Sequence, residues 1–289
     1  MSKRNYLNVG CGNKFHEDWV NVDMVSNSPY VIATNLLSGI PFEDNQFDVV
    51  YHSQVLEHIP KQEAASFIKE CFRVLKPRGI IRVVVPDLEN ITREYLRLLN
   101  ANWKEYDELN DANYEWILLE LYDQTIRNKK GGMMGEYLQQ QNVINEEYVV
   151  ERIGHIGSAI RNAVKMSGTK KLRLISSKIA SKVRSASFLS EIIRGIKLRA
   201  KKVFLTEDEK KFIEVGKFKL GGEIHYWMYD KYSLKKLLSA CGFEEIEVMD
   251  PTKSKIKDWN QYELDMKNGV LYDPVSLFLE ARKSEKPDL

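Results

Sequence analysis

Cysteine is scarce in this sequence. The chain of 289 residues has only Cys11, Cys71 and Cys241, and none of the spacings between them is that of a metal-binding motif. A sparse set with an odd count is typical of proteins from a reducing compartment. We therefore expect neither a disulfide framework nor a cysteine-based metal site.

Long apolar runs and an excess of one charge are also lacking. No uninterrupted apolar segment reaches the roughly 18 residues that a membrane-spanning helix needs. The formal net charge is +2, which by itself indicates no polyanionic partner. The first expected strand begins near residue 5, which leaves no room for a signal peptide. These absences predict a soluble, cytoplasmic protein.

The composition is otherwise that of a globular protein. Hydrophobic residues make up 43% of the chain, which is enough for a packed core and argues against global disorder. A length of 289 residues allows either one large domain with an insertion or two domains.

Two short apolar runs near the N-terminus organise the rest of the chain. Residues 6–9 lead into Gly10-Cys11-Gly12, and residues 19–22 lead into Asp23. Glycine has no Cβ, so the backbone can turn sharply and approach a ligand closely. A carboxylate at the end of the neighbouring strand can accept hydrogen bonds from both hydroxyls of a ribose. Together, these features indicate a nucleoside site at the carboxyl ends of two parallel strands.

Later apolar runs predict an alternation of strands and helices, and hence an α/β fold with a parallel sheet and right-handed crossovers. Expected strands are 29–33, 47–52, 80–87, 243–249 and 276–282, and expected helices are 53–75, ended by residues 76–79, and 233–241. The last two strands are close in sequence, which favours an antiparallel pair at one edge.

The middle of the chain has a different character. Residues 88–165 read as helical and aromatic, and residues 165–202 hold twelve Lys or Arg against the single acid Glu191. This basic stretch is also amphipathic, so it could be a solvated face of a lid, a helix on a membrane surface or a nucleic-acid contact. Its one aromatic residue is Phe188, which supplies base stacking poorly and makes nucleic acid the weakest of the three.

These changes predict three parts of the chain. Residues 1–99 would form the N-terminal part of the sheet domain, and residues 231–289 its C-terminal part. Residues 100–230 would form a helical, partly basic insertion that covers the site and binds the second substrate.

Four segments together resemble the class I S-adenosylmethionine-dependent methyltransferases, and in particular the methyltransferase type 11 group. The segments are 7–12, Asp23, 41–50 with 55–58, and 73–79. The resemblance covers a little over half of the chain. It implies S-adenosyl-L-methionine as the cofactor and a Rossmann-like, seven-stranded, mostly parallel sheet with one antiparallel edge strand.

The resemblance also implies which residues bind the cofactor. They are Asn8, Gly10, Cys11, Gly12, Asp23, Asn35, Leu36 and Ser53. Two positions depart from the family's pattern. Lys14 stands where a third glycine is frequent, and Asn35 stands where an acid usually accepts the adenine amino group. An asparagine carbonyl can still accept that bond, but without charge assistance.

Two histidines are candidates for catalysis. His52 ends the fourth expected strand, where it could face the crevice as a base or merely pack there. His225 follows Gly221-Gly222 in an aromatic stretch that could line an acceptor pocket or form a core hinge. Asp87 could reach the pocket or cap the next helix, and we expect Glu57 and His58 to cap and pack beneath the site.

The expected function is a methyltransferase that acts on a small-molecule or saccharide acceptor, with an oxygen as the favoured methyl acceptor. A non-catalytic, membrane-associated protein that keeps the nucleoside pocket is the alternative from another class. A dehydrogenase is disfavoured, because residues 13–18 are too few for a full phosphate-binding helix.

Overall fold

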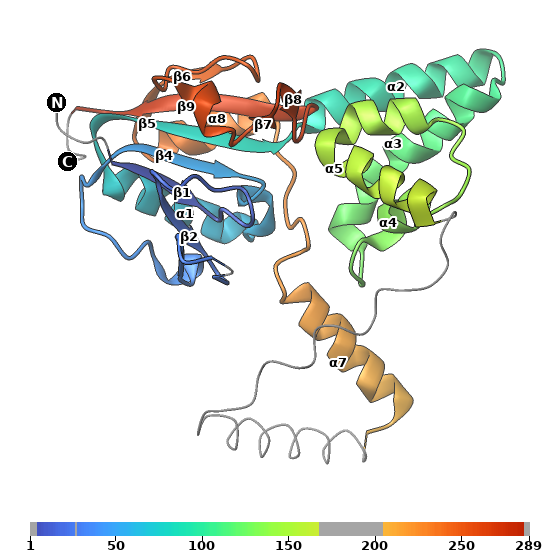
Figure 1. Cartoon of the computed structure of the whole chain (residues 1–289), viewed down its shortest axis with the longest axis horizontal. Helices are drawn as coiled ribbons and strands as arrows, with labels where there is room; N and C mark the ends of the chain where they lie inside the picture. The colour runs from blue at the N-terminus through green and yellow to red at the C-terminus, as the bar shows by residue number, and fades with distance from the viewer. Residues whose placement is uncertain (1–4, 27, 168–204, 286–289) are drawn as a thin grey trace.

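The structure is a computed structural model that describes residues 5–26, 28–167 and 205–285. Its centre is a seven-stranded sheet with the order β3-β2-β1-β4-β5-β9-β6 (Figure 1). The strands are β1 (Tyr6–Val9), β2 (Val20–Asp23), β3 (Val31–Ala33), β4 (Phe47–Ser53), β5 (Leu75–Pro86), β6 (Phe243–Val248) and β9 (Ser276–Lys283). A separate two-stranded ribbon joins β7 (Met266–Lys267) to β8 (Val270–Leu271).

The direction of the strands confirms the predicted fold class. The pairs from β3 through β5 are all parallel, whereas β9 runs antiparallel to both of its neighbours, β5 and β6. The last two strands therefore form the antiparallel edge pair expected from the sequence. The reversed strand, β9, lies second from that edge.

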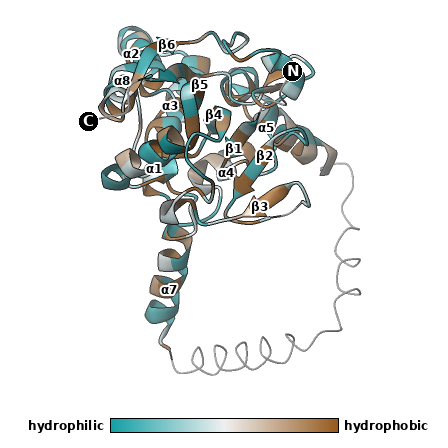
Figure 2. Ribbon diagram, turned by 90° about the vertical axis from the view of Figure 1, so that its left-hand side faces the viewer, coloured by the Kyte–Doolittle hydropathy of each residue, from teal (hydrophilic) through white to brown (hydrophobic). Residues whose placement is uncertain are grey.

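One face of the sheet is covered by two helices, α1 (Lys61–Val74) and α8 (Lys231–Ala240). Phe67 and Ile68 of α1 and Leu234 and Leu238 of α8 are buried against the strands in one continuous core. The hydropathy colouring shows β2 and β3 as largely hydrophobic (Figure 2). Of the two, β2 is the covered strand, whereas two of the three residues of β3 are exposed.

The helix that we expected over 53–75 is shorter in the structure. Ser53 is the last residue of β4, a 3₁₀ turn η2 spans Leu56–His58, and α1 begins only at Lys61. Pro60 is the N-cap of α1 with φ −51° and ψ 136°, so it sets the start of the helix. Residues 76–79 follow the helix as expected, but they belong to β5.

The other face of the sheet is covered by aromatic side chains from the segment before β7. Trp19 and Tyr51 lie edge-to-face against Trp259, with ring centroids 5.8 and 5.0 Å apart. Arg82 of β5 is fully buried in this layer and contacts two carboxylates, Asp265 at 2.8 Å and Glu280 at 2.7 Å. This face therefore combines aromatic packing with a buried ionic group.

A helical segment leaves the sheet after β5 and packs beside it (Figure 1). It contains α2 (Leu88–Lys104), α3 (Glu108–Ile126), α4 (Gly132–Leu138) and α5 (Glu146–Ser167). The next described helix, α7 (Glu207–Lys219), projects away from the sheet and from these helices (Figure 1) and has no buried residue. The mostly helical character expected for residues 88–165 is thus confirmed. The exit and return of the chain meet, since Asp87 pairs with Tyr229 and the Leu88 N–H donates to the Tyr229 carbonyl at 2.9 Å.

Most of the basic stretch 165–202 lies outside the described residues, so its three interpretations stay predictions. In the part of the chain that the structure describes, no helix is both long enough and apolar enough to cross a membrane.

Candidate active site

A large cavity at the sheet edge has a volume of about 560 Å³, within the range of small-molecule sites. It lies at the carboxyl ends of β1 and β2, where parallel sheets bind ligands. Its lining is mostly apolar and comes from distant parts of the chain: Gly10, Asp23, Met24, Val25, Asn35, Leu36, Gln54, Val55, His58, Ile59, Pro60, Glu63, Leu220, Gly221, Gly222 and Tyr226.

Gly10 and Asp23 come together at the rim of this cavity, as predicted. Gly10 and Gly12 have φ of +67° and +54°, a conformation that glycine adopts without steric cost. The Gly10 N–H donates to the Val22 carbonyl, and the Gly12 N–H donates to Asp23 Oδ2, both at 2.8 Å. A Cβ on Gly10 would lie 2.4 Å from Val55 Cγ2, so this position needs glycine for space as well as for conformation.

The two glycines allow a matched prediction. At Gly12 a Cβ would meet nothing within 4 Å, so Gly12→Ala should cost only the left-handed strain, about 1–2 kcal/mol of unfolding free energy. Gly10→Ala adds a clash with Val55 and should cost about 1–3 kcal/mol more. Urea unfolding of both variants measures the difference, and Val55→Ala in the Gly10→Ala background should recover part of it. Equal losses for the two variants would contradict the close approach of Gly10 to Val55.

Four other predicted cofactor residues do not line the cavity. Asn8 is buried, and its Nδ2 donates to the Lys14 carbonyl at 2.9 Å, so it holds the loop that follows β1. The Cys11 thiol is buried, which raises its pKa to about 12, and it therefore stays protonated near neutral pH. Gly12 and Ser53 lie next to lining residues. The expected contacts of these four with a cofactor stay predictions.

The structure places His52 away from the crevice. Its side chain is fully buried on the α1 face, with its ring 5.2 Å from that of Phe67. Neither ring nitrogen has a hydrogen-bond partner among the described residues, and burial lowers the pKa to about 3. Side chains alternate between the two faces of a strand, and His52 has the register that faces the helix. This geometry favours the alternative interpretation, in which His52 only packs.

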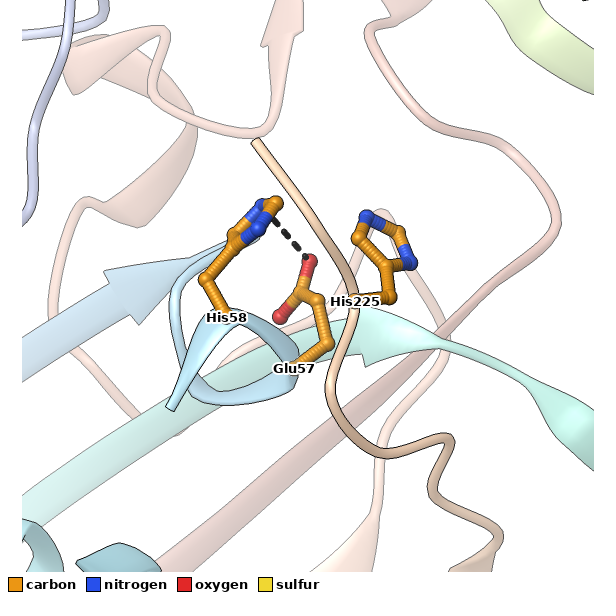
Figure 3. A group of neighbouring side chains, drawn as sticks. All are labelled: Glu57, His58 and His225. Atoms are coloured by element: carbon orange, nitrogen blue, oxygen red, sulfur yellow. Dashed lines mark ion pairs between the residues drawn. The ribbon is translucent and has the colours of Figure 1, made fainter. Parts of the chain in front are cut away.

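His225 instead joins two residues of the turn after β4, Glu57 and His58 (Figure 3). One ligand atom from each of the three lies within 4.8 Å of the others. The rings of His58 and His225 are 4.6 Å apart, and His58 Nε2 lies 3.9 Å from Glu57 Oε1. Sequence reasoning missed this group, because His225 is reached only after the whole helical segment. The aromatic stretch around Gly221-Gly222 and His225 was the one sequence signal for this group.

Burial dominates the electrostatics of these three side chains. It raises the pKa of the Glu57 carboxyl to about 8. It also lowers the pKa of His58 and lowers that of His225 well below its ordinary value, with further lowering from the Arg127 charge. The Glu57 carbonyl accepts from the Tyr226 N–H at 2.7 Å. Within the described residues its carboxyl accepts no hydrogen bond and caps no helix, so packing is the part of its predicted structural role that the structure shows.

A second, smaller cavity of about 120 Å³ lies under the helical segment. Its lining mixes polar and apolar side chains: Gln54, Pro86, Asp87, Ile91, Glu120, Gln124, Met134, Arg152, Ile153, Asp273, Val275 and Ser276. Gln54 lines both cavities. Asp87 caps α2, as one of its two interpretations predicted, and accepts from the Glu89 N–H at 2.9 Å. It lines this small cavity but not the large one.

Comparison with known proteins gives matches in the N-terminal half. Residues 18–83 match the methyltransferase domain family. A probable S-adenosylmethionine-dependent methyltransferase of Mycolicibacterium smegmatis is 45% identical over 51 residues, which make up 18% of this chain and 19% of that protein. The chain thus matches about a fifth of the length of this curated relative.

Two solved structures that align with 97% of the chain are described as methyltransferases. A SAM-dependent methyltransferase from Archaeoglobus fulgidus is 10% identical with a TM-score of 0.36, over 97% of this chain and 86% of that one. A possible histamine N-methyltransferase from Thermotoga maritima is 11% identical with a TM-score of 0.36, over 97% and 82%. These scores are low, and the fold assignment rests on the strand order of this chain.

The segment that matches the family contains Asp23 and the motif segments at 41–50, 55–58 and 73–79. The comparisons thus confirm the resemblance of this part of the chain to S-adenosylmethionine-dependent methyltransferases.

Proposed function

We propose that the chain is a methyltransferase that binds S-adenosylmethionine in the large cavity. The observation that carries this proposal is the position of Asp23 beside Gly10 at the rim of that cavity. The Asp23 carboxylate can accept the ribose hydroxyls, and the missing Cβ of Gly10 leaves room for the ligand. The match of residues 18–83 to the methyltransferase domain supports the same cofactor.

We propose the small cavity as part of the acceptor site. It adjoins the large cavity through Gln54 and is roofed by residues of α3, α4 and α5, such as Gln124, Met134 and Arg152. Its amide and carboxylate groups suit a molecule that carries several hydroxyls, such as a small polar compound or a saccharide. Oxygen is therefore the acceptor atom that we favour.

The cofactor, once bound, supplies a methyl group on a sulfonium, which is a good leaving group. The protein then has to bind both molecules, align them in line and exclude water. Asp23 and Gly10 would fix the cofactor, Gln54 lies between the two cavities, and the helical segment would close over the acceptor. A hydroxyl acceptor must also lose its proton.

Titration calorimetry on the full chain tests the cofactor proposal. We expect S-adenosylmethionine to bind and NAD not to bind, because the short link after β1 offers no phosphate-binding helix. Binding of NAD without binding of S-adenosylmethionine would overturn the proposal.

Turnover separates the enzyme from the non-catalytic alternative. The measurement is formation of S-adenosylhomocysteine with a panel of hydroxylated small molecules and saccharides. An enzyme should form it with at least one member of the panel. Tight cofactor binding with no product across the panel would favour a nucleoside-binding protein.

A further inference from the structure

We propose that Glu57, His58 and His225 form a site for a divalent transition metal ion, with zinc as the best fit. The three side chains come from η2 and from the segment that returns to the sheet, and they converge on one point beside the large cavity (Figure 3). Two imidazoles and one carboxylate are a ligand set that zinc accepts.

The buried Glu57 carboxylate lacks a hydrogen-bond partner and could bind a cation. Its side chain is fully buried, and neither oxygen has a hydrogen-bond partner within the described residues. An unsatisfied buried polar group costs about 1–3 kcal/mol, and more when it is charged. Native proteins therefore pair such groups or use them to hold an ion. A cation between Glu57 and the two histidines would satisfy the carboxylate.

The His58 ring is oriented with Nε2 toward Glu57, as a metal ligand would be. Its Nδ1 lies 3.0 Å from the Ile224 carbonyl oxygen, so Nδ1 carries the proton and donates it. Nε2 is then the unprotonated nitrogen, and it is the atom that faces Glu57 Oε1. A metal-binding histidine typically donates its other N–H to a backbone carbonyl or a carboxylate in this way.

His225 shows a related arrangement. Its Nδ1 is buried without a partner in the described structure, while its Nε2 lies 3.2 Å from the side-chain amide of Gln124. A half-turn of that amide would place Oε1 where Nε2 now lies, and the oxygen could accept the Nε2–H. Nδ1 would then be free to bind a metal.

The charges around the site also allow a cation. Arg127 is the nearby positive group that lowers the pKa of both histidines. Its guanidinium is already paired with Asp123 at 2.9 Å and with Glu223 at 3.3 Å. The Glu57 carboxyl has no arginine or lysine paired with it among the described residues, so it is available to the ion, which would displace its proton on binding.

The distances suit a small ion after a modest closure. Bonds of about 2.0–2.2 Å place the ligands of a tetrahedral zinc a little over 3 Å apart. The three ligand atoms now lie within 4.8 Å of one another. Displacements of about 1 Å by rotation of the side chains would bring them to the separations that zinc needs. With three protein ligands, one coordination position stays open for an oxygen, as in catalytic zinc sites. Because His58 also lines the large cavity, that position would take water or, if the proposed function holds, an acceptor hydroxyl.

Metal binding is measured directly on the full chain, without S-adenosylmethionine. The purified chain is stripped with a chelator, dialysed against Zn²⁺, and its metal content is determined by elemental analysis. We expect one bound zinc per chain, and a visible absorption spectrum when Co²⁺ replaces zinc. His225→Ala and Glu57→Gln should each weaken binding at least about 100-fold, since even the loss of an outer partner costs 10–100-fold.

His155→Ala is the matched control, because His155 is an exposed histidine outside both cavities. It should bind zinc like the unaltered chain. Circular dichroism of each variant checks that the fold persists. No zinc in the unaltered chain, or equal binding in His225→Ala and the control, would overturn the metal site. Calorimetry with S-adenosylmethionine on the stripped chain reports separately on the proposed function.

Discussion

Asp23→Ala is expected to bind S-adenosylmethionine at least about 100-fold more weakly than the unaltered chain. The carboxylate would accept two charge-assisted bonds from the ribose, each with a contribution of about 1.5–3 kcal/mol. Their loss corresponds to at least two factors of ten in the dissociation constant. Titration calorimetry of both chains at the same salt concentration gives this ratio.

A loop effect has to be separated from a ligand effect, because Asp23 also accepts from the Gly12 and Val25 N–H groups. Asp23→Asn retains an acceptor for one of these bonds but removes the charge, so it should keep the loop and still bind weakly. Asp18→Ala changes a carboxylate whose side chain is 78% exposed on the preceding link, and binding should not change. Full affinity in Asp23→Ala would exclude Asp23 as the ribose acceptor.

Arg82→Ala is expected to lower the free energy of unfolding by about 3–5 kcal/mol, as the loss of one partner from a buried ionic group does elsewhere. Arg82 is fully buried, and its removal leaves Asp265 and Glu280 without their cation. The Tyr51 hydroxyl, which donates to Asp265 Oδ1 at 2.6 Å, cannot replace that charge. The measurement is urea unfolding followed by circular dichroism.

Arg93→Ala is the control for the loss of an arginine. Arg93 lies on α2 with its side chain 77% exposed and pairs only locally with Glu89, so the unfolding midpoint should stay close to that of the unaltered chain. A triple variant that replaces Arg82, Asp265 and Glu280 by apolar residues should be more stable than Arg82→Ala alone. If Arg82→Ala unfolds at the midpoint of Arg93→Ala, the ionic group does not stabilise this face.

The sheet was predictable because its central strands are buried on both faces. Most residues of β4 and of the second half of β5 are apolar and buried, and such stretches are typical of a parallel strand. The start of α1 was predicted too early, because residues 53–59 are apolar enough to continue the helical pattern. Pro60 was visible in the sequence as a boundary within that helix, and in the structure it is where α1 begins, because proline has no N–H to donate inside a helix.

The cofactor side of the site was predictable for a similar reason. Gly10 and Asp23 are near in sequence and end adjacent strands, so their meeting follows from the parallel order of β1 and β2. The meeting of Glu57 and His58 with His225 does not follow from any local pattern. It depends on the route by which the chain returns from the helical segment, and on the Tyr226 N–H that binds the Glu57 carbonyl.

The junction between Leu88 and Tyr229 has a consequence for how such a chain can diverge. A backbone hydrogen bond already joins the departing and returning segments there, so we expect the sheet to tolerate changes in the residues between them. Replacement of the segment between Leu88 and Tyr229 would change which acceptor binds, while the part of the cavity around Asp23 would keep its shape. Exchange of this one segment would thus give the same sheet a new substrate specificity.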